Sequence, residues 1–389
     1  MRITLVNHAY ADDVIDPDAL LERYSTLTGW SEAVAGAGAT VSVAQRFHRD
    51  ARLVRGGIEY VFREDGPRGH PRSRLWPQRL HRTIHSLEPD LVHVNGLNVP
   101  FQTWMLHRGL PSSTALVVQD HGGGASVGDG HWFRRSVRRA AMRSVDAFFF
   151  TAAAQAEPWR RAGMIGPNQH VHQVLEASTK MRPIERTAAR ADTGVDGDPA
   201  ILWVGRLNAN KSPLTILDGF ESSLSRLPDA VLTMVYGADD LLPAVKQRLQ
   251  ASPLLARAVR LVGAVPHDAV AAFYSAADVF VLGSHHEGSG YALIEACACG
   301  VPPVVTDIPT FRMITGSGSV GALWPPDDAE RLADALVAVA QRDRTRSRQA
   351  VLDHFRAALS WEAVARQAMD AYAKVHADAS SARLAPEHR

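Results

Sequence analysis

Hydrophobic residues along this chain fall into two kinds of segment. Short runs of apolar, β-branched residues, such as 2–6 and 40–44, predict buried strands, whereas residues 25–38 between them have apolar positions at helical spacing. A strand, a helix and a second strand in this order predict a βαβ unit with parallel strands. Because this pattern continues, residues 1–182 are predicted to form a doubly wound α/β domain.

A second series of strands and helices begins at residue 200. The chain has 389 residues and 46% apolar content, which is more than one compact core usually accommodates, so two domains are predicted. The stretch before residue 200 is rich in proline, glycine and mixed charge, which is typical of a linker. The predicted divisions are an N-terminal domain at 1–182, a linker at 183–199, a C-terminal domain at 200–359, a helix at 360–376 and a tail at 377–389.

Composition excludes several classes of protein. The net charge is +1, so no affinity for nucleic acid follows from it. The only two cysteines, Cys297 and Cys299, are two residues apart in a predicted helix and cannot form a disulfide with each other. The lack of a disulfide framework fits a reducing compartment. Residues 1–6 are predicted to be a strand rather than a signal peptide. We therefore expect a cytoplasmic protein.

The most informative stretch lies between two predicted strands, 278–282 and 303–306. It contains the turn Gly288-Ser289-Gly290 followed by a helix that begins at Tyr291. Glycines permit close approach to the backbone, and unpaired N–H groups at a helix start attract anions, so this turn could hold a pyrophosphate. The alternative is that such glycines serve only the turn itself.

Two carboxylates flank this turn. Glu287 precedes it, and Glu295 lies eight residues further on, about two helical turns later. Carboxylates accept hydrogen bonds from sugar hydroxyls, so this pair at an anion site would suit a sugar nucleotide. The alternative for Glu295 is an ordinary acid on the helix surface.

Two cations follow the first strand of the second series. Arg206 comes directly after Gly205, and Lys211 is five residues further on, just before a predicted helix. Two cations at the carboxyl end of a strand can hold a diphosphate and stabilise the charge that develops on it as a leaving group. Unrelated loop cations are the alternative.

Histidines in the N-terminal half are the remaining candidates. His121 ends a predicted strand and precedes three glycines, so it is predicted to face the cleft between the domains, with Asp120 orienting it. The alternative is a helix cap or interface residue. His81 and His85 are one helical turn apart without a third ligand, so they are predicted to be a surface pair rather than a metal site.

One predicted helix is strongly basic. Residues 131–143 contain five arginines and no acidic residue. Such a helix could contact a membrane that carries a lipid-linked acceptor, which would place the protein at the inner membrane face. A solvated helix face is the alternative.

Two of these motifs, together with the loop 263–267 between them, occur in an order that resembles one family. The spacing from Glu287 to Glu295 resembles the E-x7-E motif of retaining glycosyltransferases of family 4 (glycosyl transferases group 1), and residues 205–211 resemble their G-R-L-x-x-x-K-G motif, with Ser212 in place of the last glycine. The resemblance spans most of the chain and is most specific at 200–310. It implies a GT-B fold, with two Rossmann-like doubly wound domains facing a central cleft and the C-terminal helix crossing back to the first domain.

The resemblance also implies a role for each candidate residue. A nucleotide-diphosphate sugar would be the donor, without a metal or cofactor. The resemblance implies that the diphosphate is bound by Gly205, Arg206, Lys211 and the backbone of Gly288, Ser289, Gly290 and Tyr291. The base would lie at Gly263 and Val265. Glu295 would bind the ribose, and Glu287 and His121 would bind the transferred sugar. The acceptor hydroxyl would attack from the face of the leaving phosphate, which would take its proton.

Departures from the family keep other readings open. Residues 7–10 replace a Gly-Gly pair after the first strand, and residues 175–179 replace a Pro-Asn-Gly turn. A non-catalytic donor-binding subunit therefore stays as an alternative. A sugar-nucleotide epimerase with a GT-B fold is a second alternative, because it would use the same donor site without an acceptor. A nicotinamide enzyme is disfavoured because no G-x-G-x-x-G follows the first strand. The acceptor could be a glycan, a lipid-linked sugar or a small metabolite.

Overall fold

The computed structural model divides the chain into two units. The first unit contains Met1–Ala177 and Trp361–Arg389, and the second contains Ser178–Ser360. Each unit has its own sheet of mostly or entirely parallel strands, with helices packed on it. The residues that the structure describes are 1–67, 76–122, 132–167 and 169–384.

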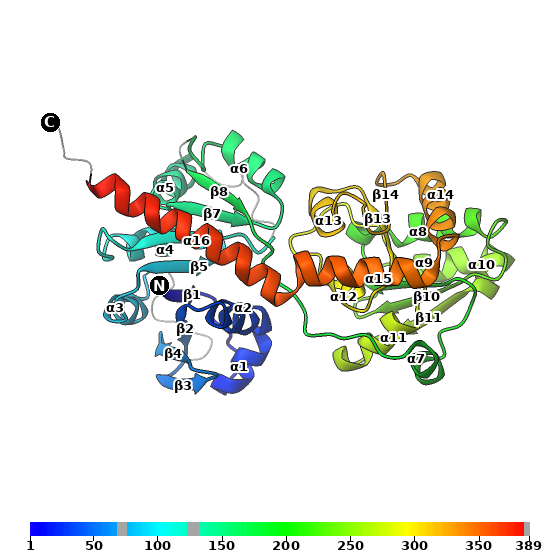
Figure 1. Ribbon diagram of the computed structural model, residues 1–389, viewed down its shortest axis with the longest axis horizontal. Coiled ribbons are helices and arrows are strands. Elements are labelled where there is room, and N and C mark those ends of the chain that lie inside the picture. Colours follow the sequence, from blue (N-terminus) through cyan, green and yellow to red (C-terminus); the bar gives the residue numbers. More distant parts are fainter. Residues whose placement is uncertain (68–75, 123–131, 168, 385–389) are drawn as a thin grey trace. The chain divides into compact units, whose positions relative to one another are not determined.

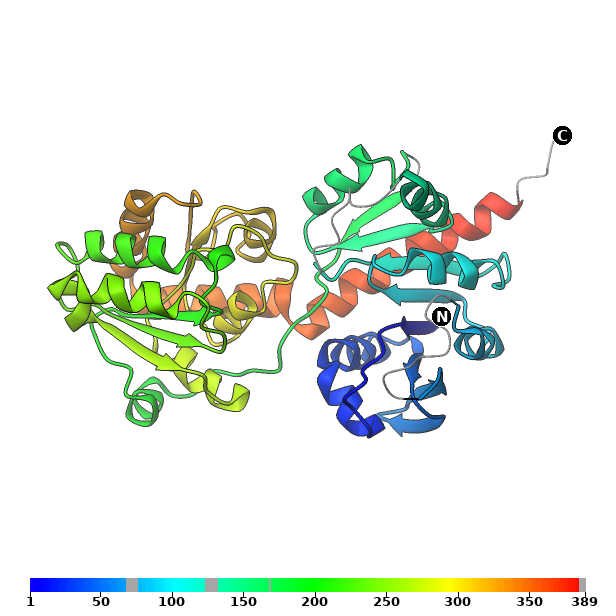
Figure 2. The ribbon, with the colours of Figure 1, turned by 180° about the vertical axis from the view of Figure 1, so that it is seen from behind.

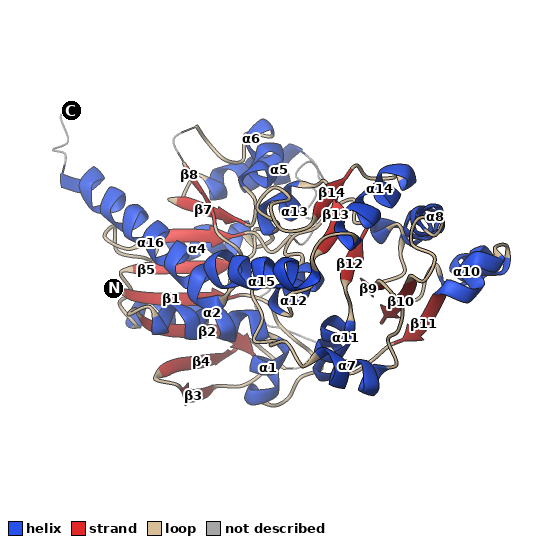
Figure 3. Cartoon of the chain, turned by 45° about the vertical axis from the view of Figure 1, so that its right-hand side comes forward, coloured by secondary structure: helices blue, strands red, loops and turns tan. Residues whose placement is uncertain are grey.

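The first unit is built on an eight-stranded sheet in the order β3-β4-β2-β1-β5-β6-β7-β8 (Figure 3). All neighbouring strands are parallel except β3 and β4. Its strands are β1 (Arg2–Asn7), β2 (Thr40–Phe47), β3 (Ala51–Arg55), β4 (Ile58–Glu64), β5 (Leu91–Asn95), β6 (Ala115–Gln119), β7 (Ala147–Phe150) and β8 (His170–Gln173). Its helices are α1 (Pro17–Arg23), α2 (Ser25–Gly36), α3 (Gln78–Ser86), α4 (Pro100–His107), α5 (Trp132–Met142), η1 (Ala153–Ala156), α6 (Glu157–Arg161) and α16 (Trp361–Leu384).

Alternation along the central strands gives this sheet two buried faces. Val94, Val118 and Phe150 belong to one core cluster together with side chains of α3, α4, α5 and α6. The neighbouring His93 and Phe149 point the other way and contact Tyr372 of α16. Successive side chains of a strand face opposite sides, so helices on both faces leave these strands almost entirely apolar.

The C-terminal helix α16 packs against α2 on the first unit (Figure 1). A Cβ atom at Gly29 of α2 would lie 2.4 Å from the Trp361 ring, so glycine is needed for this contact. The Trp30 indole donates a hydrogen bond to the Tyr372 hydroxyl at 3.1 Å. The predicted tail from residue 377 is wrong in part, because α16 continues to Leu384 and buries Val375 and Ala379.

The second unit is built on a six-stranded, fully parallel sheet in the order β11-β10-β9-β12-β13-β14. Its strands are β9 (Ala200–Gly205), β10 (Val231–Tyr236), β11 (Val259–Gly263), β12 (Val279–Leu282), β13 (Pro303–Thr306) and β14 (Ala322–Trp324). Its helices are α7 (Arg186–Thr193), η2 (Ala209–Lys211), α8 (Pro213–Ser223), α9 (Leu242–Gln250), α10 (Pro253–Ala258), η3 (His267–Ala269), α11 (Val270–Ala276), α12 (Tyr291–Ala298), α13 (Pro309–Ile314), α14 (Ala329–Ala340), α15 (Arg344–His354) and η4 (Phe355–Leu359).

Helices of the second unit pack in two groups. Helix α8 packs against α14, and α11 packs against α7 (Figure 2). The segment 183–199 is therefore part of the second unit rather than a linker. Its mixed charge has a structural cause: Glu185 accepts hydrogen bonds from the first N–H groups of α7, and arginines of that helix bind Asp278.

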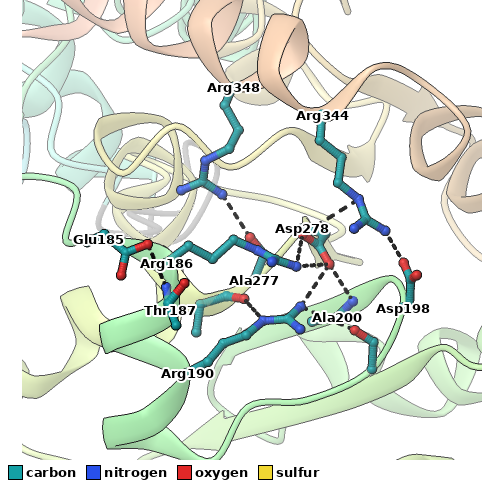
Figure 4. A network of polar contacts seen from close by, with 12 residues as sticks. Glu185, Arg186, Thr187, Arg190, Asp198, Ala200, Ala277, Asp278, Arg344 and Arg348 are labelled. Atoms are coloured by element: carbon teal, nitrogen blue, oxygen red, sulfur yellow. Dashed lines mark hydrogen bonds and ion pairs between the residues drawn. The ribbon is translucent and has the colours of Figure 1, made fainter.

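Asp278 is the centre of the polar network that joins these elements (Figure 4). Its side chain is 4% exposed and accepts hydrogen bonds from Arg186 at 2.7 Å, from Arg190 at 3.0 Å and from the Ala200 N–H at 2.9 Å. Arg348 donates to the Ala277 carbonyl at 2.9 Å. Asp278 therefore connects α7 to the starts of β9 and β12.

Two histidines meet in the interior of the first unit. Nε2 of His8, after β1, lies 3.2 Å from Nε2 of His81, and both residues are buried, so the predicted surface position of His81 is wrong. Burial and the charges of His81 and Arg46 hold the pKa of His8 well below its usual range. Burial, with the charges of His85 and Arg46, lowers the pKa of His81 to about 4.

These pKa shifts predict a loss of stability in acid. The unfolded chain protonates these histidines near pH 6.5, whereas the folded chain does so only at lower pH, so the free energy of unfolding falls as pH decreases from about 6.5 to about 4. We expect His81 alone to contribute roughly 3 kcal/mol to this loss. In melting curves across this range, His81→Gln should show a shallower decline than the wild type. The exposed His170→Gln serves as control, and equal declines in all three proteins would contradict the prediction.

Candidate functional site

The candidate site lies where the strand order of the second sheet reverses. From β9 the chain moves outward through β10 and β11, and it then returns to β12 on the other side of β9. Loops that follow two such strands diverge and leave room for a ligand at the carboxyl ends. Lys211 follows β9 and Glu287 follows β12, so both predicted residues lie at this point.

Lys211 and Glu287 form an ion pair between Nζ and Oε1. Their side chains are 16% and 14% exposed, so water reaches the pair only in part. The Ser284 hydroxyl donates a second hydrogen bond to Glu287 Oε1 at 2.6 Å. The carboxylate is therefore held in one position, close to a cation that can also serve an anionic ligand.

Asn210 joins the two loops. Its side-chain amide donates to the His286 carbonyl at 3.0 Å and accepts from the His286 N–H at 3.2 Å, while its own carbonyl accepts from the His285 N–H at 2.9 Å. Three hydrogen bonds thus fix the Lys211 loop against the Glu287 loop. Asn210 was not identified from the sequence, although its place beside Lys211 was a usable signal.

The structure gives a physical reason for serine at position 212, where the family motif has glycine. Its φ is +42°, in the left-handed region where glycine is favoured. Its hydroxyl lies 2.7 Å from His285 Nε2. A side chain here therefore gains a contact to the Glu287 loop in place of the freedom of glycine.

The glycine turn is shaped by packing as well as by access. Gly290, with φ +71°, precedes α12, and a Cβ atom there would lie 2.7 Å from Ile314 Cδ1. Ser289 is buried, whereas Tyr291, the first residue of the helix, is 43% exposed. The Thr310 hydroxyl donates to the Glu287 carbonyl at 2.7 Å. The turn is thus fixed by contacts with α13.

Glu295 is brought to the loop that follows β11. Its carboxylate lies 3.0 Å from His267 Nε2 and accepts a hydrogen bond from the Tyr274 hydroxyl at 3.2 Å. Burial raises the pKa of Glu295, and the hydrogen bonds of His267 and Tyr274 partly offset this. The alternative of a surface acid is therefore wrong. His267 and Tyr274 were not identified from the sequence.

The remaining second-unit candidates lie at the same edge of the sheet. Arg206 directly follows β9 and is exposed. Gly263 ends β11 with φ +89°, and Val265 is half-buried in the loop that leads to His267. Lys211 pairs with Glu287, and His267, which follows the loop that begins at Gly263, contacts Glu295.

His121 lies at the carboxyl end of β6 in the first unit. Its Nδ1 is 2.8 Å from Glu176 Oε2 and its Nε2 is 3.1 Å from Asn95 Oδ1. Glu176 is 1% exposed and comes from residues 175–179, the segment that departs from the family pattern. Burial and the charge of Glu176 raise the pKa of the neighbouring Asp120 to about 6. Of the three glycines after His121, Gly123 and Gly124 lie outside the described residues.

The other departure, at residues 7–10, is held by side chains. Gln45 donates to the Ala9 carbonyl at 2.8 Å, and Arg46 donates to the His8 carbonyl at 3.1 Å. The Ala9 N–H donates to Asn7 Oδ1 at 3.0 Å. This loop is therefore fixed by polar contacts rather than being an open glycine turn.

The basic helix α5 uses part of its charge internally. Arg139 donates to the Ala162 carbonyl at 2.9 Å, and the Arg138 guanidinium lies 5.0 Å from the centre of the Trp159 ring. Trp132, at the start of the helix, is 70% exposed.

Within the described part of the chain, every helix is too short or too polar to cross a bilayer. Nor do the described residues contain a cluster of His, Cys, Asp and Glu side chains fit to hold a metal.

Comparison with known proteins finds a family model that matches most of the second unit. Residues 185–350 match the family described as Glycosyl transferases group 1. A D-inositol 3-phosphate glycosyltransferase of Frankia alni is 32% identical over 200 residues, which are 49% of this chain and 49% of that protein. A GDP-mannose:cellobiosyl-diphosphopolyprenol alpha-mannosyltransferase of Xanthomonas campestris is 28% identical over 281 residues, which are 71% of this chain and 70% of that protein. The chain spans about half the length of curated relatives such as the Frankia protein.

The fold is also similar to solved structures. A sucrose-phosphate synthase from Thermosynechococcus elongatus superposes with a TM-score of 0.68 at 21% identity, over 97% of this chain and 99% of that one. Identity at this level shows the fold alone. The predicted GT-B class, with two Rossmann-like domains, is confirmed.

Proposed function

We propose that this protein is a retaining glycosyltransferase that moves a sugar from a nucleotide-diphosphate sugar to an acceptor hydroxyl. The observation that carries the proposal is the Lys211–Glu287 ion pair at the strand-order reversal of the second sheet. It puts a cation and a hydrogen-bond acceptor at the place where α/β sheets bind ligands. The match of residues 185–350 to Glycosyl transferases group 1 supports the same activity.

Each side chain has a task in this proposal. Lys211 and the exposed Arg206 hold the diphosphate, assisted by backbone N–H groups at the start of α12. Glu287 accepts hydrogen bonds from the transferred sugar, and Glu295 from the ribose hydroxyls. For Glu295 this means that ribose hydroxyls share the carboxylate with His267 or replace its contact. From the first unit, His121 contacts the donor sugar.

The chemistry of this proposal is the one that the family resemblance implies. The acceptor oxygen forms a bond to the anomeric carbon as the bond from that carbon to the diphosphate breaks, on the same face of the sugar. The departing phosphate oxygen takes the acceptor proton, so no protein nucleophile is required. Cations at the diphosphate stabilise the charge that develops there, which is the largest contribution expected from the protein.

The acceptor class follows from relatives only in outline. The Xanthomonas relative is named for a polyprenol-linked acceptor and the Frankia relative for inositol 3-phosphate. We propose a glycan, a lipid-linked sugar or a small metabolite as acceptor, in the cytoplasm. For a lipid-linked acceptor, the exposed Trp132 and Arg135 of the basic segment 131–143 are the proposed contact to the inner membrane face.

Thermal stabilisation by nucleotides tests this proposal. We expect one of UDP, GDP, ADP and dTDP to raise the melting temperature of the wild type and not that of Lys211→Ala. At about 100 times its dissociation constant a ligand adds roughly 2.7 kcal/mol, which is readily measured. The absence of any shift would contradict a donor site. Mass analysis of the products then separates transfer to an acceptor from epimerisation of the donor.

A further inference from the structure

Both ring nitrogens of His121 face oxygen atoms that accept hydrogen bonds. Nδ1 lies 2.8 Å from the Glu176 carboxylate, and Nε2 lies 3.1 Å from the side-chain oxygen of Asn95. A neutral imidazole has one N–H group, so it can donate to only one of them. Donation to both requires the imidazolium.

Glu176 is placed to stabilise that charge. It is 1% exposed, and a buried carboxylate requires a compensating cation or hydrogen bonds. The titratable groups facing His121 are Glu176 after β8, Asp120 at the end of β6 and His93 on β5. Burial lowers the pKa of His121, but the hydrogen bond and charge of Glu176, with a smaller effect of Asp120, outweigh this and raise it.

We propose that Glu176 is a positioning residue that keeps His121 protonated, so that His121 meets the donor sugar as a charged N–H donor and not as a general base. The proposal rests on the proposed function for its substrate but not for the protonation state. An imidazolium has no lone pair, so its Nε2–H recognises a hydroxyl oxygen or a phosphate oxygen that replaces Asn95. A charged donor also agrees with a mechanism in which the leaving phosphate takes the acceptor proton.

A histidine NMR titration of the wild-type protein, without substrate, tests the protonation state directly. His121 resonances are assigned with His121→Gln. We expect both ring nitrogens to be protonated at pH 6.5, and a titration midpoint above the value of about 6.5 found for histidine in short peptides. A single neutral tautomer at pH 6.5 would overturn the proposal, whether or not the protein proves to be a transferase.

Variants then identify Glu176 as the cause. Glu176→Gln keeps the size of the side chain, and we expect it to lower the His121 midpoint by about one pH unit or more, since a shift of this size corresponds to loss of one close charge. The His170 resonance, on β8 and exposed, should stay unchanged. Glu176→Asp should restore part of the shift. An unchanged His121 midpoint in Glu176→Gln would refute the role of Glu176.

The pH profile of turnover separates positioning from a merely structural role. If His121 must be protonated, turnover falls above its pKa, and Glu176→Gln moves this alkaline limb to lower pH. A structural defect would instead reduce turnover equally at every pH. Nucleotide binding to the second unit should stay as in the wild type, so loss of nucleotide stabilisation would point to failure of the proposed donor site and not of this inference.

Discussion

Replacing Lys211 by alanine is expected to lower turnover by about 100-fold or more. Nζ of Lys211 is the cation that holds Glu287 Oε1 and, in the proposed reaction, the charge that develops on the leaving diphosphate. Removal of one preorganised group of this kind from a catalytic site typically costs 100- to 1,000-fold. Because the Glu287 side chain is only 14% exposed, the variant also leaves a largely desolvated carboxylate without its cation.

The measurement is turnover with the donor whose base the melting experiment identifies. Lys246→Ala is the matched control, because it removes the same side chain from an exposed position on α9 of the same unit. Melting curves must show that Lys211→Ala is folded. Near-normal turnover of a folded Lys211→Ala protein would rule out the assigned role of this lysine.

The second large effect is on stability. We expect Asp278→Asn to lower the free energy of unfolding of the second unit by about 3–5 kcal/mol, the range for removal of one partner from a buried ion pair. The carboxylate is 4% exposed and faces Arg186 and Arg190 (Figure 4). The neutral amide removes the negative charge that both arginines face while keeping the volume, so the loss would be electrostatic rather than a cavity effect.

Urea unfolding, monitored by hydrogen exchange in β9 and β12, measures this loss of stability locally. Urea is preferred to guanidinium because added salt screens the interaction under test. Peptides from β1 and β5 of the first unit provide an internal reference. Asp334→Asn is the matched control, since Asp334 pairs with Arg226 but is 57% exposed, and it should cost less than about 1 kcal/mol. Equal losses in the two variants would contradict the central role of Asp278.

Much of the fold is visible in the spacing of apolar residues. The strands predicted at 2–6, 40–44 and 303–306 lie where the structure has β1, β2 and β13. Strands of this kind are buried on both faces, so their sequences are nearly continuous apolar runs. By contrast, the edge strand β3 was missed, because three of its five residues are exposed and it carries no such run.

Predictions based on polar and charged residues were wrong where those residues form contacts in the folded structure. The arginines and acids of residues 183–199 indicated a linker, yet Arg186 and Arg190 bind the buried Asp278, 92 and 88 residues further along the chain. The histidine at position 81 looked exposed beside arginines but meets His8 in the interior. The sequence does not reveal whether a polar residue forms its hydrogen bonds with water or with a side chain far away along the chain.

Local patterns were enough to predict the two α/β domains and the candidates Lys211, Glu287 and Glu295, because strand periodicity and the order of glycine turns are local properties. The partners of the candidate residues became known only from the folded chain: Glu287 with Lys211, Glu295 with His267 and Tyr274, and His121 with Glu176. These pairs join loops at the ends of different strands. The order of strands in a sheet, and therefore which loops meet, depends on the packing of the whole domain and not on any single segment.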